Sequence, residues 1–311
     1  MANRSAYISG GRQDSPGSRL VSAMETWNSV NITLPEGQFG RSAVILSGGV
    51  VIDAKDFDFE FTVPFDDDAE ANESELVVYN LTWNTINKLV YNNPITIMAG
   101  YKEDTGIVCK GYIKKVSSKQ EGTDRVTTIK ILDDPDRQEH SILSRTFNAG
   151  ASASEILKAL IEELNMPLAV FETARDRKFN DAKTVDGDLM QNIRTYAEIC
   201  GISVYINKGQ VFARPLTSGD AVDFTVSEET GLIESPEEFT EENEVETGDD
   251  GERTVDRVHG YKLRMLLQHR ITTAAIIHLK SNGVYGRFRV RSGQHIFNES
   301  ESITELEVID A

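Results

Sequence analysis

Two stretches of this 311-residue chain follow the same plan although they lie far apart in the sequence. Trp83–Val116 and Gly260–His295 each begin with a short amphipathic segment, pass through a polar break and continue as a run rich in β-forming residues. An internal repeat constrains the fold strongly, because one structural unit must then occur twice. Two interpretations are open at this point: the chain holds two related β-barrel domains, or any two β-hairpins would look this similar.

The parallel extends over three features of each stretch. The polar breaks are Asn92-Asn93-Pro94 and Gln268-His269-Arg270, the β runs are Ile95–Ala99 and Ala275–Leu279, and the strands that follow begin Gly111-Tyr112-Ile113-Lys114 and Gly286-Arg287-Phe288-Arg289. We align these last two strands at their glycines, so that Gly111 matches Gly286.

Hydrophobic periodicity divides the chain into alternating β and α/β parts. Phe57–Val63 alternates strictly between apolar and polar residues, which predicts a half-buried strand. Ser152-Ala153-Ser154-Glu155 is a capping box and predicts the start of a helix. We therefore predict a mainly β fold with an α/β insert and with two related β-barrel domains per chain. The predicted parts are an N-terminal arm (1–40), a first β-barrel domain (41–145), the insert (146–215) and a second β-barrel domain (216–311).

The net charge of −18 is concentrated in two segments. Residues 66–75 and 234–256 together carry 16 of the 18 excess negative charges. We expect the second segment to be an acidic loop, since it has almost no apolar spacing. An acidic chain repels phosphate, so tight binding to nucleic acid is not expected. The simplest interpretation is that both segments are solvated loops.

The sequence carries no motif for catalysis, for a cofactor or for a metal ion. Its two cysteines, Cys109 and Cys200, are 91 positions apart, and none of its five histidines has metal-ligand spacing. No run of about 20 apolar residues indicates a membrane helix, and the first residues have no apolar core of a secretory signal. We expect no enzymatic activity, no cofactor, no metal site and no membrane contact.

The order of these parts and several motifs resemble the central hub proteins of phage tail baseplates, the late control protein D-like family of contractile phages and phage-tail-like bacteriocins. The resemblance rests on the insert wording SASEILKALIEELNMPL and GDLMQNIRTYAEICGISVYINKGQVFARP, and on the ending V-x-G-x-F-x-V at Val284–Val290 with His295 nearby. It covers about residues 43–311. One departure is visible, because the family often has glycine where this chain has Thr273-Ala274-Ala275.

The resemblance implies a structural protein of a contractile injection system, assembled in the bacterial cytoplasm and located in the tail baseplate. Hubs of this kind are homotrimers whose duplicated barrels form a pseudo-sixfold ring. Such a ring is a symmetry adapter between the hexameric tail tube protein and the trimeric central spike protein. Baseplate wedge and tape-measure proteins are further candidate partners.

The resemblance also suggests contact residues. If the two β runs lie at open strand edges, Ile95, Ile97, Ile277 and Leu279 are candidates for the oligomer and tube interface; the alternative is that they are barrel core. If the acidic segments face the lumen, they keep the DNA path unattractive to phosphate. The candidate lumen-facing acids are Asp66, Asp67, Asp68, Glu241, Glu242, Asp249 and Asp250.

Two alternative functions remain. A distal tail protein of a non-contractile phage shares the implied fold, and neighbouring genes for sheath and wedge proteins would distinguish the two. A wall-degrading or sugar-binding enzyme is a different class, and clearing of a host-wall suspension by the purified protein would reveal it.

Overall fold

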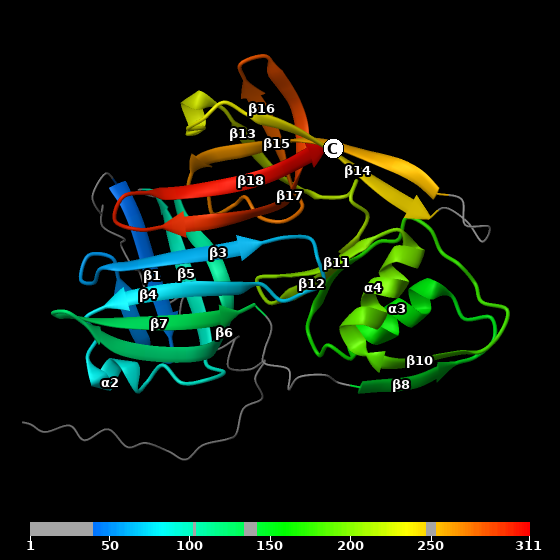
Figure 1. Ribbon diagram of the computed structural model, residues 1–311, viewed down its shortest axis with the longest axis horizontal. Coiled ribbons are helices and arrows are strands. Elements are labelled where there is room, and N and C mark those ends of the chain that lie inside the picture. Colours follow the sequence, from blue (N-terminus) through cyan, green and yellow to red (C-terminus); the bar gives the residue numbers. More distant parts are fainter. Residues whose placement is uncertain (1–39, 102–103, 134–141, 247–252) are drawn as a thin grey trace, which may run out of the picture. The chain divides into compact units, whose positions relative to one another are not determined.

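The computed structural model describes residues 40–101, 104–133, 142–246 and 253–311 (Figure 1). The chain is mainly β with a small helical insert, as predicted. Most of the predicted N-terminal arm lies outside the described residues. We call residues 41–132 the first half, 142–214 the insert and 220–310 the second half.

The elements are as follows. The first half contains β1 (Arg41–Ser47), β2 (Val50–Asp53), β3 (Phe59–Phe65), β4 (Glu73–Tyr79), α2 (Trp83–Ile86), β5 (Pro94–Tyr101), β6 (Asp104–Glu121) and β7 (Asp124–Leu132). The insert contains β8 (Ile142–Phe147), α3 (Ala153–Glu162), β9 (Leu168–Phe171), β10 (Lys183–Asp188), α4 (Leu189–Cys200), β11 (Ser203–Asn207) and β12 (Gln210–Arg214). The second half contains β13 (Asp220–Val226), η2 (Glu228–Thr230), β14 (Glu237–Glu246), β15 (Arg253–Leu266), β16 (Ala275–Ser281), β17 (Val284–Phe297) and β18 (Ser302–Asp310).

The strands of the two halves follow the same order in the sheet. The first half has the order β1-β5-β6-β7-β4-β3, and the second half has β13-β16-β17-β18-β15-β14. Each strand of the first half except the short β2 therefore has one counterpart, and the counterparts follow in the same order along the chain. One difference is that β1 pairs antiparallel with β5 whereas β13 pairs parallel with β16. Two unrelated hairpins would not share a six-strand order, so the repeat is structural.

A β-bulge at the same place in both halves fixes the register of the repeat. The pairing of β6 with β7 shifts between Ile113 and Lys115, and the pairing of β17 with β18 shifts between Val290 and Ser292. Aligning the two bulges makes Ile113 equivalent to Val290. Gly111 is then equivalent to Phe288, so the predicted match of Gly111 with Gly286 is wrong by two positions. The hairpin turns differ in length, which makes spacing along the sequence an unreliable guide to register.

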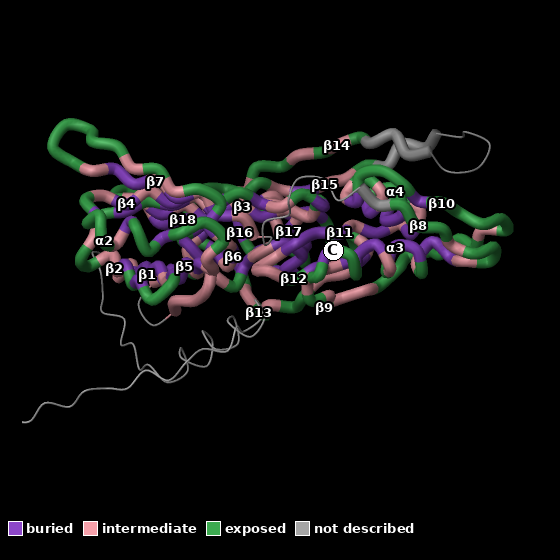
Figure 2. The backbone as a smooth tube through the Cα atoms, turned by 90° about the horizontal axis from the view of Figure 1, so that it is seen from below, coloured by how far each residue is buried: buried purple, intermediate pink, exposed green. Residues whose placement is uncertain are grey.

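The two predicted barrels are joined into one 13-stranded sheet, because β3 of the first half pairs antiparallel with β17 of the second (Figure 1). Each half nevertheless has its own core (Figure 2). The two cores exchange one aromatic ring each. Phe297 of β17 packs in the core of the first half, and Phe65 of β3 packs in the core of the second half. The junction is thus built from apolar contacts as well as backbone hydrogen bonds.

The insert forms a third core around its two helices. Helix α3 begins at the predicted capping box: the Ser152 side chain accepts from the Glu155 amide, and the Glu155 carboxylate accepts from the Ser152 amide at 2.9 Å. Helix α4 begins at Asp188, whose carboxylate caps the Gln191 amide, and ends at Gly201 in the left-handed conformation. Within the described residues, no helix has both the length and the apolar character needed to cross a membrane.

The second acidic segment is largely not a loop. Glu237–Glu246 pairs along its whole length with Arg253–Lys262 to form a long antiparallel hairpin. The prediction of a loop over 234–256 is wrong for these residues, because backbone pairing with β15 outweighs the low β-propensity of glutamate. The remaining predicted loop, 247–252, lies outside the described residues.

Candidate assembly surfaces

The apolar junction between the two halves is centred on Phe297. Its ring lies 5.3 Å from the ring of Phe61 and 5.6 Å from that of Phe59, in stacked geometry. The ring of His295, on the same strand, lies 5.0 Å from that of Phe65. His295 is fully buried, and burial lowers the pKa of its imidazole to about 3. The junction is thus packed with aromatic rings and a neutral buried imidazole.

A buried ion pair reinforces the same junction. Arg289 of β17 is 0% exposed, and it donates to the Asp67 carboxylate at 2.8 Å and to the Ser218 carbonyl oxygen at 3.0 Å. Asp67 belongs to the connection between β3 and β4. Its neighbour Asp66 has a pKa raised to about 6, first by burial and then by the charges of Asp68 and Asp67. The connection therefore serves to hold the second half, and is more than a solvated loop.

A second polar contact joins the two halves between the start of β6 and the segment before β16. The Asp104 carboxylate, at the start of β6, accepts from both terminal nitrogens of Arg270 at 3.1 and 2.6 Å and from the Gln268 side chain at 3.0 Å. Bidentate geometry of this kind fixes orientation as well as distance. It holds the polar segment before β16 against the first half.

The insert is attached through its β11–β12 hairpin. Lys208 at the tip of this hairpin donates to the His269 carbonyl oxygen at 3.3 Å, and burial lowers the pKa of its ammonium group to about 8. Arg214, 2% exposed at the end of β12, forms a bidentate pair with Asp220 at 3.1 and 2.7 Å. These contacts tie the insert to the segment before β16 and to the start of β13.

The four predicted apolar contact residues lie in the cores. The exposed fractions are 1% for Ile95, 0% for Ile97, 0% for Ile277 and 2% for Leu279. Strand β5 has β1 and β6 as neighbours, and β16 has β13 and β17. In the single chain neither strand offers an open edge, and the four side chains follow the barrel-core alternative that the sequence left open. The bulge register does make Ile95 equivalent to Ile277 and Ile97 equivalent to Leu279.

The predicted acidic residues fall into three groups. Asp66, Asp67 and Asp68 belong to the β3–β4 connection, where the Asp68 carboxylate accepts from the Glu70 amide at 2.6 Å. Glu241 and Glu242 lie on β14, paired with Arg291 at 2.6 Å and Arg257 at 2.9 Å. Asp249 and Asp250 lie outside the described residues. The β3–β4 connection and the β14–β15 hairpin are equivalent in the repeat, so the two acidic segments occupy the same place in the two halves.

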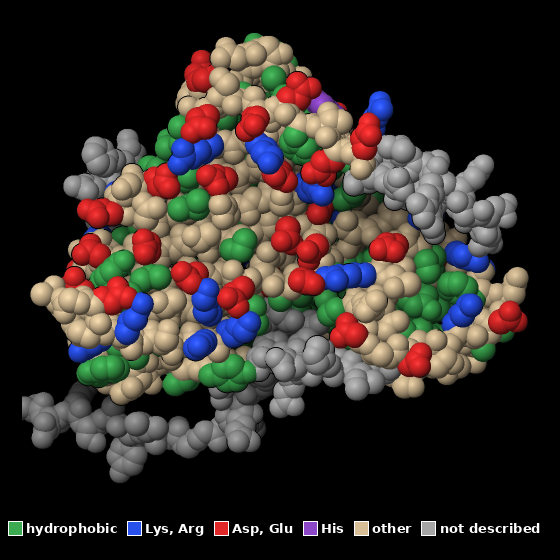
Figure 3. All heavy atoms as spheres, in the orientation of Figure 1, with side chains coloured by type: hydrophobic (Ala, Val, Ile, Leu, Met, Phe, Trp, Pro, Cys, Tyr) green, Lys and Arg blue, Asp and Glu red, His purple; other side chains and the backbone are tan. Residues whose placement is uncertain are grey.

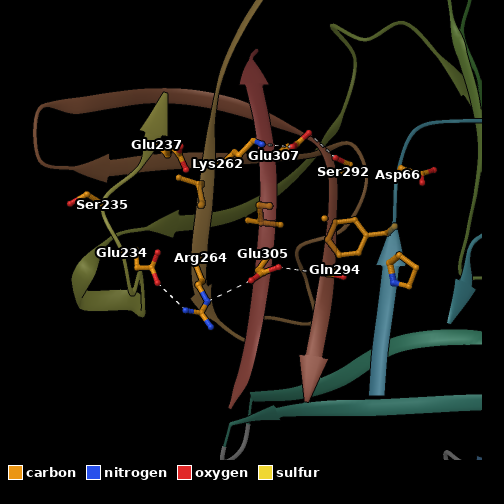
Figure 4. A pocket seen from close by; sticks show the side chains of 15 residues that line it. Asp66, Glu234, Ser235, Glu237, Lys262, Arg264, Ser292, Gln294, Glu305 and Glu307 are labelled. Carbon is orange, nitrogen blue, oxygen red and sulfur yellow. Dashed lines mark hydrogen bonds and ion pairs between the residues drawn. The ribbon is translucent and has the colours of Figure 1, made fainter. Parts of the chain in front are cut away.

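A polar groove of about 450 Å³ lies over β15, β18 and β17 (Figure 4). Its two basic residues are paired with acids: Arg264 contacts Glu234 at 2.9 Å and Glu305 at 3.6 Å, and Lys262 contacts Glu307 at 3.4 Å. Asp66 and Glu237 also line the groove, so five acids face two bases there. Acidic and basic side chains are interspersed in the same way over the rest of this face (Figure 3). Among the described residues no group of His, Cys, Asp and Glu could hold a metal ion. The groove is thus a polar surface that carries an excess of acidic side chains.

Several strand edges are open within the described part of the chain, among them the outer edges of β2 and β13, and two others concern the repeat. The outer edge of β14 has no partner strand, since β14 pairs only with β15. Strand β6 pairs with β5 through Asp104–Tyr112 and with β7 through Tyr112–Glu121, so Val116–Gln120 has a neighbour on one side only. Open edges are templates for pairing with another chain.

Sequence reasoning missed Arg289, Asp104 and Arg214. A buried arginine inside an alternating Arg-x-Arg-x-Arg strand, Arg287 to Arg291, has no signal of its own in a single sequence, because the strand face that is buried depends on the register. Asp104 had no signal because its partner is 166 residues away.

By sequence, no protein-family model and no curated protein matches the chain. Solved structures match it by fold. The 43 kDa tail protein of prophage MuSo2 from Shewanella oneidensis superposes with a TM-score of 0.62 at 8% identity, over 87% of this chain and 97% of that one. The tail protein from Neisseria meningitidis MC58 gives 0.57 at 10% identity, over 88% and 97%.

A third match comes from a secretion system. The E. coli c3393 protein is described as a component of the type VI secretion system with structural similarity to the T4 bacteriophage tail proteins gp27 and gp5. It superposes with a TM-score of 0.52 at 8% identity, over 86% of this chain and 76% of that one. The resemblance predicted from the sequence is thus confirmed at the level of fold: this chain has the fold of phage tail and baseplate proteins.

Proposed function

We propose that the chain is the central hub of the baseplate in a phage tail, a phage-tail-like bacteriocin or a related injection system. In this role three copies form a ring that joins a hexameric tail tube to a trimeric central spike. The protein acts as a structural adapter and not as an enzyme.

The observation that carries the proposal is the duplicated six-strand unit. A sixfold tube and a threefold spike present different symmetries, and closed contacts to both require a component that offers six similar surfaces and three identical ones. Three chains with two equivalent halves each provide both. The shared fold with tail and type VI secretion proteins supports the same role.

The equivalence of the two acidic segments gives the proposed ring a charge pattern. Three copies would carry six acidic segments at similar intervals, three from the β3–β4 connection and three from the described strands of the β14–β15 hairpin. In the proposed ring these segments border the central channel, where their negative charge keeps DNA from adhering. Outside the two acidic segments the chain carries an excess of only two negative charges.

The proposal is tested by co-expressing the chain with the tube and spike proteins encoded beside it. We expect a complex that contains three hub chains and three spike chains, with tube protein bound in multiples of six. A chain that binds neither protein when all three are produced together contradicts the proposal. Clearing of a cell-wall suspension by the purified chain would favour the enzyme alternative.

A further inference from the structure

We propose that β14 of one copy pairs with the free part of β6, Val116–Gln120, in the next copy. This inference rests on the proposed trimer and names the surfaces that build it. The argument uses the one junction that the chain already contains, between its own two halves.

The edge of β6 is the counterpart of an edge that is occupied within the chain. Strand β17 leaves β16 after Arg289, and Gly293–Phe297 then pairs with β3 on the side that β16 vacated. By the bulge alignment, Gly293–Phe297 corresponds to Val116–Gln120 of β6. That segment leaves β5 in the same way, and no described strand takes the vacated side.

The strand that would fill this edge is also given by the repeat. Strand β3 is the partner of β17 within the chain, and its counterpart in the second half is β14. Among the described strands, none pairs with the outer edge of β14. The sheet of one chain therefore offers β14 at one edge, and the sheet of the next chain offers the free part of β6, which is an edge of matching type. Repeating the internal junction between chains gives a head-to-tail contact, which closes when three copies complete the ring.

The register of the new pairing follows from the internal one. In the chain, His295 lies opposite Val63 and Ile296 lies opposite Thr62. The counterparts of His295 and Ile296 are Ser118 and Lys119. The β4–β15 equivalence makes Glu238 the counterpart of Val63 and Glu237 the counterpart of Thr62. Glu238 then lies opposite Ser118, and Glu237 lies opposite Lys119.

The charges of the two edges are complementary. The described start of β14 carries four exposed or half-exposed acids, and this end of β6 carries three exposed lysines. These residues are Glu237, Glu238, Glu241 and Glu242 on β14, and Lys114, Lys115 and Lys119 on β6. Opposite charges across a strand pair stabilise that register and oppose alternatives. Since the charged residues of these two edges are exposed or half-exposed, association between copies should weaken as salt is added.

Disulfide trapping tests the register. We would prepare full-length chains with Ser118→Cys, Glu238→Cys, Lys119→Cys or Glu237→Cys; the native Cys109 and Cys200 are buried and free, so they do not compete. Opposite residues alternate between wide and narrow pairs, so at least one of 118/238 and 119/237 has disulfide geometry. We expect a mixture of two complementary variants to give a covalent dimer on mild oxidation, and neither variant alone to do so. A mixture of Ser118→Cys with Thr240→Cys, shifted by two residues, is the matched control.

Charge exchange tests the same contact without cysteines. Glu237→Lys or Lys119→Glu alone should weaken association about tenfold, and the two together should restore it. The molar mass of the same samples separates the two levels of the account. Trimers that neither cross-link at these pairs nor respond to the exchange overturn the pairing and leave the hub intact. A chain that forms no trimer, alone or with its spike, overturns both.

Discussion

Asn92 and Ala274 occupy the same position in the two halves and share a left-handed backbone, with φ of 60° and 61°. Asn92 lies just before β5, and Ala274 lies just before β16. The amide of each donates at 2.8 Å to the carbonyl oxygen of the residue at the bulge, which is Ile113 in β6 and Val290 in β17. Asparagine tolerates this conformation, whereas alanine adopts it at a cost of about 1 kcal/mol. Glycine adopts this conformation without strain, so the backbone at Ala274 favours glycine at this position.

Replacing Ala274 by glycine should therefore stabilise the protein. We expect Ala274→Gly to raise the free energy of unfolding by about 0.5–1 kcal/mol, because relief of strain outweighs the added freedom of the unfolded chain. Denaturant titration would measure the change. Ala275→Gly, at the next position in regular strand, is the matched control and should lower stability by about 1 kcal/mol. Equal effects at both positions would contradict the argument.

Breaking the buried ion pair should destabilise the junction. Asp67→Asn leaves the fully buried Arg289 without its counter-charge, and we expect a loss of about 3 kcal/mol in the free energy of unfolding. Glu242→Gln removes an exposed pair, in which Arg257 and Glu242 are 73% and 58% exposed, and should cost less than about 1 kcal/mol. A similarly small loss for both variants would show that Asp67 does not hold the junction.

The buried His295 should make the protein sensitive to acid. Its pKa falls from 6.5 in the unfolded chain to about 3 in the fold, so the unfolded state binds the proton more readily. The free energy of unfolding is therefore unaffected by His295 above pH 6.5 and decreases as the pH falls from 6.5 toward 3. At pH 5 the decrease due to His295 is about 2 kcal/mol. Stability of His295→Gln measured between pH 7 and pH 5 should fall less than that of the wild type by this amount. His278→Gln, at an exposed position on β16, should follow the wild-type slope; parallel slopes for all three proteins would contradict the assignment.

Helices and strands could be predicted from the sequence where the signal lies in neighbouring residues. The capping box at Ser152 depends on neighbouring residues and starts α3 as predicted. The alternating strand predicted at Phe57–Val63 also forms, but it lies two residues later, as β3 (Phe59–Phe65). The repeat was also visible, because equivalent strands keep similar apolar patterns. Its register was not, because the bulges at Ile113 and Val290 shift the pairing without leaving a mark in residue spacing.

The surfaces were harder to predict than the cores. Ile95 and Ile277 have the apolar pattern of an edge strand and of a core strand alike, and only the neighbours found in the structure distinguish the two. Likewise, Glu237–Glu246 lacks the residues that favour strands, yet it forms one through pairing with a distant segment. Such choices depend on contacts between parts of the chain that a single sequence does not link.

The central claim is that the two halves act as equivalent units of one ring. End-on views of the purified protein by electron microscopy, averaged without imposed symmetry, test it most directly. The account predicts a closed ring of six similar lobes with true threefold symmetry, in which each lobe corresponds to one half of a chain. Particles with twofold symmetry, open filaments, or single chains that stay separate with the spike present would contradict it.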